Sequence, residues 1–151
     1  STQAPNEQSY LVSAAENLLF QAQNLKPLNT DHTANLARLN TRWYAAVTDE
    51  AEKNERLALA EHYYQLALTL SPQNSVIRNE LARLALEVGG DCDRALALYD
   101  EAVAIDPFYA QNHLARADAY ILGSSGFDGA ASSSAFALPA EESWAARALG
   151  S

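Results

Sequence analysis

The 151-residue sequence predicts an all-α solenoid of about three helix-turn-helix units with a C-terminal capping helix. The main sign is a pattern of alanine, a large residue, alanine and proline at offsets 0, 4, 7 and 12, which occurs three times. Alanine is also abundant and β-branched runs are scarce, which favours helix over strand. The three copies are Ala15, Leu19, Ala22 and Pro27; Ala60, Tyr64, Ala67 and Pro72; and Ala95, Tyr99, Ala102 and Pro107.

This pattern, called the signature below, has a physical interpretation. The first three positions lie on one face of a helix. The small alanines let a neighbouring helix approach closely, and the large residue fills the groove between them. Proline cannot continue the helix and sets the turn into the next one. Each unit buries its apolar face only against its neighbours, so the units must stack.

The turns between the signatures place the remaining helix ends. We expect Asp31, Ser75 and Asp91 to be N-caps, because their side chains can accept a hydrogen bond from the first helical turn. The pair Gly89-Gly90 is expected to form the turn between two helices. The predicted helices span about residues 8–25, 31–48, 53–70, 74–88, 91–105 and 108–122.

The first full unit is longer than the second. Pro72 and Pro107 are 35 residues apart, whereas Pro27 and Pro72 are 45 apart. The extra residues fall around 46–56, a polar and helix-favouring stretch. We therefore expect longer helices here, with a short turn near residues 48–54.

The C-terminal part has a different composition. The solenoid is expected to span residues 1–123, followed by a Gly- and Ser-rich flexible linker over 124–138. Residues 139–151 are expected to form a short helix with Pro139 in its first turn and an apolar stripe around Trp144 and Ala148. This helix would either cap the open end of its own solenoid or dock in a neighbour's groove.

The signature resembles the second helix of the tetratricopeptide repeat (TPR). The best match to the first helix of that motif runs over 110–123, where His113, Ala117 and Tyr120 take the motif positions and His113 is expected to be packed. The resemblance covers about residues 8–123. Since the first signature belongs to a second helix, its partner helix would precede Ser1, and we expect the chain to be part of a longer, bacterial protein. Further matches are Leu81, Ala82 and Ala85 in the middle unit and Leu36 and Ala37 in the first.

The resemblance implies a non-catalytic scaffold that binds a peptide or partner protein in a concave groove. The groove positions that it implies are Ala34, Arg38 and Thr41; Val76, Asn79, Arg83 and Leu86; and Gln111, Leu114, Asp118 and Ile121. The expected partner contacts are Arg38, Asn79, Arg83, Leu86, Gln111, Leu114 and Asp118.

Three of these side chains could hold a carboxylate together. Arg38, Asn79 and Arg83 resemble part of the carboxylate clamp of chaperone-binding TPR proteins, because guanidinium groups bind carboxylates in a bidentate manner. The match is partial, since Leu114 and Asp118 stand where that clamp needs cations. The alternative is that the arginines pair with acidic residues of adjacent helices.

A second resemblance concerns residues 25–39, followed by a lengthened helix pair and Tyr63-Tyr64. This stretch is similar to the TPR tails of bacterial O-antigen ligase/polymerase-type membrane proteins. It implies an accessory domain tethered to a membrane-bound glycan enzyme whose chemistry lies elsewhere in the full-length chain. The compartment stays open between the bacterial cytoplasm and the extracytoplasmic side of the membrane.

Composition argues against several other functions. The net charge of −9 repels phosphate backbones, so no nucleic-acid partner is expected. Cys92 lies between Asp91 and Asp93, which disfavour a reactive thiolate. His32, His62 and His113 lack a neighbour at a metal-ligand spacing, so we expect no catalytic residue, metal or cofactor. A stand-alone enzyme is the weakest alternative.

Overall fold

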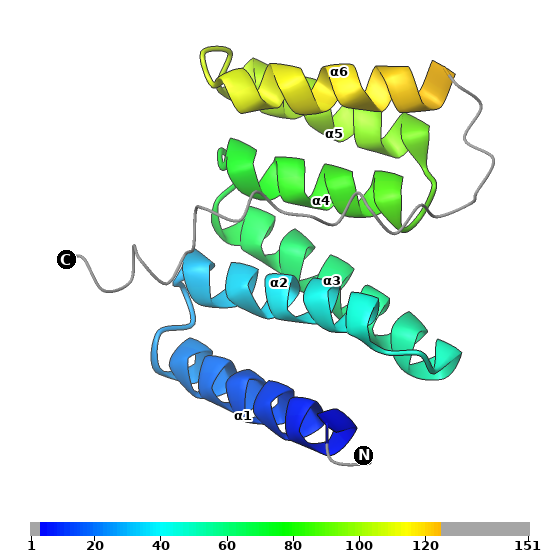
Figure 1. The fold of residues 1–151 in the computed structure, drawn as a ribbon. Helices are drawn as coiled ribbons and strands as arrows, with labels where there is room; N and C mark the ends of the chain where they lie inside the picture. Colours follow the sequence, from blue (N-terminus) through cyan, green and yellow to red (C-terminus); the bar gives the residue numbers. More distant parts are fainter. Residues whose placement is uncertain (1–3, 125–151) are drawn as a thin grey trace.

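The computed structural model describes residues 4–124, which form six α-helices and no strand (Figure 1). The helices are α1 (Ala4–Leu25), α2 (Thr30–Ala46), α3 (Glu50–Leu70), α4 (Ser75–Glu87), α5 (Cys92–Ile105) and α6 (Ala110–Ser124).

The helices stack in chain order from α1 at one end to α6 at the other (Figure 1). Each helix packs on the next along the chain, most extensively α2 on α3 and α4 on α5, and α4 also packs on α6. Contacts therefore run between sequence neighbours, as in a solenoid. The predicted all-α solenoid is confirmed.

Two of the three predicted N-caps are wrong. Asn29 caps α2 by accepting a hydrogen bond from the Asp31 N–H at 2.9 Å, and Asn74 caps α4 by accepting from the Ile77 N–H at 3.1 Å. In both turns an asparagine precedes the expected residue and satisfies the free N–H groups first. The prediction for Asp91 is confirmed, since its side chain accepts from the Arg94 N–H at 3.0 Å.

The lengthened unit is confirmed, although its turn is shorter than predicted. Helices α2 and α3 have 17 and 21 residues, compared with 13 in α4 and 14 in α5. Helix α3 already begins at Glu50, because Asp49 caps it by accepting from the Glu52 N–H at 2.9 Å. Trp43 Nε1 donates to Glu52 Oε1 at 2.8 Å and ties the two helices together across this turn.

The α4–α5 turn depends on both of its glycines, as the sequence predicts. Gly90 has a φ of 62°, a left-handed conformation that side chains other than glycine rarely adopt. A Cβ atom on Gly89 would lie 2.8 Å from the Ala85 carbonyl oxygen. The pair therefore lets the chain reverse directly against the end of α4.

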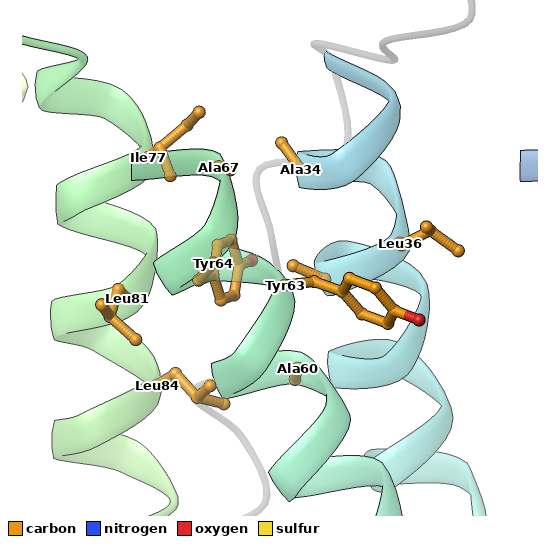
Figure 2. Close-up of a cluster of buried hydrophobic side chains, with 10 residues drawn as sticks. Ala34, Leu36, Ala60, Tyr63, Tyr64, Ala67, Ile77, Leu81 and Leu84 are labelled. Carbon is orange, nitrogen blue, oxygen red and sulfur yellow. The ribbon is translucent and has the colours of Figure 1, made fainter. Parts of the chain in front are cut away.

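The signature positions form the core in the middle of the stack. Ala60 and Ala67 of α3 are fully buried, and Tyr64 between them is 2% exposed. Leu81 and Leu84 of α4 project toward this face of α3 (Figure 2). The equivalent residues of α5 are also buried, which confirms that the alanines face neighbouring helices: Ala95, Tyr99 and Ala102.

Ion pairs join each signature helix to the next. Arg56 of α3 contacts Glu16 of α1 at 3.1 Å, and Arg94 of α5 contacts Glu61 of α3 at 2.6 Å. Glu16 and Glu61 both follow the first alanine of their signature by one residue. The third signature has Leu96 at this position, a partly buried side chain packed on the core.

The predicted packing of His113 is wrong. Its side chain is exposed, and its Nε2 is hydrogen-bonded to the Pro107 carbonyl oxygen at 2.8 Å. The neighbouring Asn112 is fully buried instead and donates to the carbonyl oxygens of Ala102 at 2.9 Å and Asp106 at 2.8 Å. The free carbonyl groups at the end of α5 need donors, and the side-chain amide of Asn112 donates to two carbonyl groups there.

Two further points concern the extent of the structure. The predicted linker and C-terminal helix lie outside the described residues. Within residues 4–124, no helix combines the length and apolar character needed to cross a lipid bilayer.

Candidate functional site

The predicted partner contacts come from α2, α4 and α6, and side-chain contacts connect these three helices. Arg38 of α2 pairs with Glu80 of α4, and Asn79 of α4 donates to Asn112 Oδ1 of α6. On α4, Val76, Asn79 and Arg83 follow at helical spacing and therefore share one face. We call the surface defined by Arg38, Asn79, Arg83 and Asp118 the α2–α4–α6 face.

Arg38 is held by acceptors within the chain. Its Nε and Nη2 donate to the two oxygens of Glu80 at 3.0 Å each, and its Nη1 donates to Asn35 Oδ1 at 2.9 Å. Burial opposes the charged form, but the hydrogen bond and attraction of Glu80 outweigh it, so the pKa of Arg38 is raised. Arg38 thus follows the alternative in which an arginine pairs with an acid of the adjacent helix.

The signature tyrosines connect the core to this face. Tyr64 of α3 is hydrogen-bonded to Thr41 of α2 and lies within electrostatic range of Arg38, Glu80 and Arg83. Burial is the main reason that the pKa of Tyr64 is raised well above 10.0. The hydroxyl of this core residue therefore lies where α2 and α4 meet.

Tyr99 of α5 has the equivalent place between α4 and α6. Burial raises the pKa of the Tyr99 hydroxyl from 10.0 to about 12; the positive charge of Arg83 opposes this shift, while Glu87 and Asp118 add to it. Burial also raises the pKa of Glu87, again opposed by Arg83. Arg83 therefore acts on groups of α3, α4 and α5 and lies centrally on the α2–α4–α6 face.

Arg83 differs from most other cations of the chain. Arg83 is half-buried as a residue, and within residues 4–124 its guanidinium makes no hydrogen bond and no ion pair shorter than 4.0 Å. A guanidinium carries five N–H donors, so Arg83 keeps its binding capacity for a further acceptor. The arginines that do pair with acids are Arg38, Arg56, Arg78, Arg94 and Arg116.

The remaining predicted residues differ in accessibility. Leu86 and Ala34 are buried, at 4% and 0% exposure, so they pack in the core and do not line a surface. Gln111, Asp118 and Leu114 on α6 are exposed. The apolar side chains of this face that reach solvent are Val76, Leu114 and Ile121.

Sequence analysis missed Glu80, Glu87 and the two tyrosine hydroxyls. The signature treats position +4 as a large filler, and only the hydroxyl distinguishes Tyr64 and Tyr99 from Leu19. A tyrosine at a core position needs a partner for its hydroxyl, which was the available signal. Glu80 lies three residues before Arg83, so it shares a helix face with it, and this spacing could have drawn attention to it.

Two other features lie apart from this face. An open hollow of about 520 Å³ at the α3–α4 turn contains none of the predicted contacts; it is lined by Leu70, Ser71, Pro72, Gln73, Asn74 and Ser75. In the described part of the chain, no group of three or more His, Cys, Asp or Glu side chains is arranged to hold a metal ion.

Comparison with known protein families and with curated proteins finds no match. Among solved structures, a thermophilic TPR protein of Thermus thermophilus matches over 76% of this chain and 76% of its own, with 19% sequence identity and a TM-score of 0.43. At this TM-score the likeness carries no argument, and the fold rests on the helices and contacts described above.

Proposed function

We propose that this chain is a non-catalytic, TPR-like interaction scaffold that binds a peptide or partner protein on the α2–α4–α6 face, with Arg83 as the anchor for a carboxylate. The observation that carries this proposal is a half-buried arginine whose guanidinium has no ion pair shorter than 4.0 Å in residues 4–124, although the chain is strongly acidic. A buried or half-buried charge costs solvation energy unless something pairs with it, so Arg83 is suited to an acidic ligand.

The surroundings of Arg83 define the partner further. Val76 on α4 and Leu114 and Ile121 on α6 are exposed large apolar side chains on the same face. A partner segment that fits this face would place one acidic group against Arg83 and apolar side chains against these three residues. Because Arg38 and Asn79 are engaged by Glu80 and Asn112, the anchor is a single arginine and not a three-residue clamp.

The placement of the remaining reactive side chains supports a binding role. Cys92 begins α5, His62 is exposed on α3, and His113 on α6 is hydrogen-bonded to a backbone carbonyl. Within residues 4–124 no hydrogen bond joins any two of these three side chains, whereas catalysis of the nucleophile and base type requires such groups within hydrogen-bond reach of each other.

The test is capture of partners by the purified chain, identification by mass spectrometry, and titration of the captured peptide. Arg83→Glu should weaken binding of the peptide by at least about tenfold, since hydrogen bonds to charged groups contribute about 1.5–3 kcal/mol. Lys26→Glu is the matched control, because Lys26 is exposed in the α1–α2 turn and has no ion pair in the described chain. Equal binding of the peptide by the wild type and Arg83→Glu would show that the peptide does not bind on this face.

A further inference from the structure

Helix α1 presents a row of exposed leucines that the proposed function does not use. Leu11, Leu18 and Leu25 are 64%, 65% and 83% exposed, although they lie on a helix. They are seven residues apart, and Ala14 and Gln21 fall between them at the intermediate seam positions. We call these five residues the α1 seam. A seven-residue leucine spacing is typical of two helices packed along their length.

The α1 seam lies at one end of the stack. Helix α1 packs on α2, and Ala15, Leu19 and Ala22, which lie beside the seam at helical spacing, are half-buried. The three leucines of the seam stay exposed in the part of the chain that the structure describes. An exposed apolar row of this length is a usual sign of an association surface.

Charge identifies what kind of surface can approach. The whole chain has a net charge of −9, so two copies repel each other over most of their surfaces. Helix α1 contains two charged residues, Glu7 and Glu16, and Glu16 is neutralised by Arg56 at 3.1 Å. The seam itself is uncharged, so here a second copy meets apolar surface at the least electrostatic cost.

The equal spacing of the leucines makes the seam self-complementary. Reversing one α1 about Leu18 brings Leu11 to the level of Leu25 of the second copy and Leu18 to the level of its own counterpart. The small Ala14 leaves room beside Leu18 for the opposing side chain. Antiparallel pairing also separates the two Glu7 carboxylates and aligns the helix dipoles favourably.

We propose that the α1 seam is a homodimer interface, in which α1 packs antiparallel on α1 of a second copy with Leu18 at the two-fold axis. Three leucines per copy make a small interface, so the dimer forms reversibly as the protein concentration rises. Salt strengthens it, because screening weakens the repulsion between two acidic copies.

Sedimentation of the full chain over a range of concentrations tests this proposal. The wild type should shift from monomer to dimer, and Leu18→Glu and Leu18→Lys should each stay monomeric, because like charges then meet at the axis. An equimolar mixture of the two variants should dimerise again. Phe108→Glu is the control: Phe108 is 94% exposed at the α5–α6 turn, so this variant should dimerise like the wild type.

Cysteine cross-linking tests the direction of packing. In a Cys92→Ser background, Leu18→Cys should form a disulfide-linked dimer, since the two positions meet at the axis. Leu11→Cys should cross-link to a chain carrying Leu25→Cys and not to itself. Self-linking of Leu11→Cys would overturn the antiparallel arrangement.

Three other results would overturn the homodimer. The wild type could stay monomeric at every concentration, Leu18→Glu could dimerise like the wild type, or salt could weaken the association, which would indicate an ionic interface elsewhere. A monomer that dimerises only after residues 125–151 are removed would show that the C-terminal segment occupies the seam instead.

Discussion

Helices α3 and α1 carry the same signature in different surroundings. In α3, Ala60 and Ala67 are fully buried and Tyr64 is almost so, because α2 packs on one side and α4 on the other. In α1 the equivalent Ala15, Leu19 and Ala22 are only half-buried, since α2 packs extensively on α1 whereas α3 reaches it through fewer contacts, among them the Arg56–Glu16 pair.

The difference shows that the signature encodes a packing face and not a buried position. Its alanines are fully buried only where neighbouring helices pack on both sides of the helix. The α6 end agrees with this. Ala117 and Tyr120 of α6 are exposed, whereas Ala82 and Ala85, each 35 positions earlier on α4, are buried against α5. Interior and terminal copies of one pattern should therefore respond differently to the same substitution.

The largest difference is expected for loss of the large signature residue. Tyr64→Ala should destabilise the chain by about 3–5 kcal/mol, as is typical of aromatic truncation in a core. Leu19→Ala on α1 should cost about 1–2 kcal/mol, because less apolar area is buried there. Urea unfolding followed by circular dichroism measures both. Similar losses would mean that the ends are packed as tightly as the middle.

Enlarging a signature alanine should give the next effect. Ala67→Leu should overpack the contact between α3 and its neighbours and destabilise the chain by about 1–3 kcal/mol. Ala22→Leu, at the same offset on α1, should change stability by at most about 0.5 kcal/mol, as partly open positions usually do. Unchanged unfolding of Ala67→Leu would contradict the helix-packing role of the signature.

Alkaline pH should also lower the stability of the folded chain, because it ionises the interior tyrosines. The folded chain raises the pKa of Tyr99 from 10.0 to about 12, so above pH 10 the unfolded state has lost more protons than the folded state. The contribution of Tyr99 to stability is therefore constant below about pH 10 and should fall by roughly 2 kcal/mol as the pH rises to 12. Tyr99→Phe should show a shallower decline in urea unfolding at several pH values. Parallel curves for the two proteins would assign the decline to other groups.

The smallest effect is expected at the ion pairs between signature helices. Arg94→Gln breaks the contact with Glu61, in which both side chains are about one-third exposed, and should cost about 0.2–1 kcal/mol. Arg56→Gln at the α1 end should cost more, since Arg56 is less exposed and also donates to Asn40 Oδ1 at 3.1 Å. The Arg94 effect should shrink in high salt. An effect that salt does not alter would indicate lost packing of the arginine stem.

Periodic features of the fold were predictable, whereas features set by one neighbour were not. The signature and prolines placed all six helices of residues 4–124 to within a few residues, because each copy repeats the same packing problem. The caps were displaced to Asn29 and Asn74, since a turn uses whichever side chain reaches the free N–H groups first. On α6, the motif position pointed to His113, but the carbonyl groups at the end of α5 select Asn112.

The candidate site was predictable as a set of positions but not as a set of free groups. Helical spacing brings Arg38, Asn79 and Arg83 to related faces of α2 and α4. Which arginine forms an ion pair depends on the stagger between these helices, which places Glu80 against Arg38 and leaves Arg83 without a hydrogen bond or an ion pair shorter than 4.0 Å in the described chain. The repeat pattern in the sequence does not contain that stagger.

The residue that follows the first signature alanine makes the joints between signature helices unequal. Glu16 and Glu61 each receive an arginine from the next signature helix, whereas Leu96 offers none. If the α3–α4 segment were duplicated in tandem, the new joint would keep the carboxylate of Glu61 but would have Leu59 at the signature offset of Arg94. Duplicating α5–α6 would instead bring a guanidinium against Leu96, so either duplication would lose an ion pair of about 0.2–1 kcal/mol at the new joint.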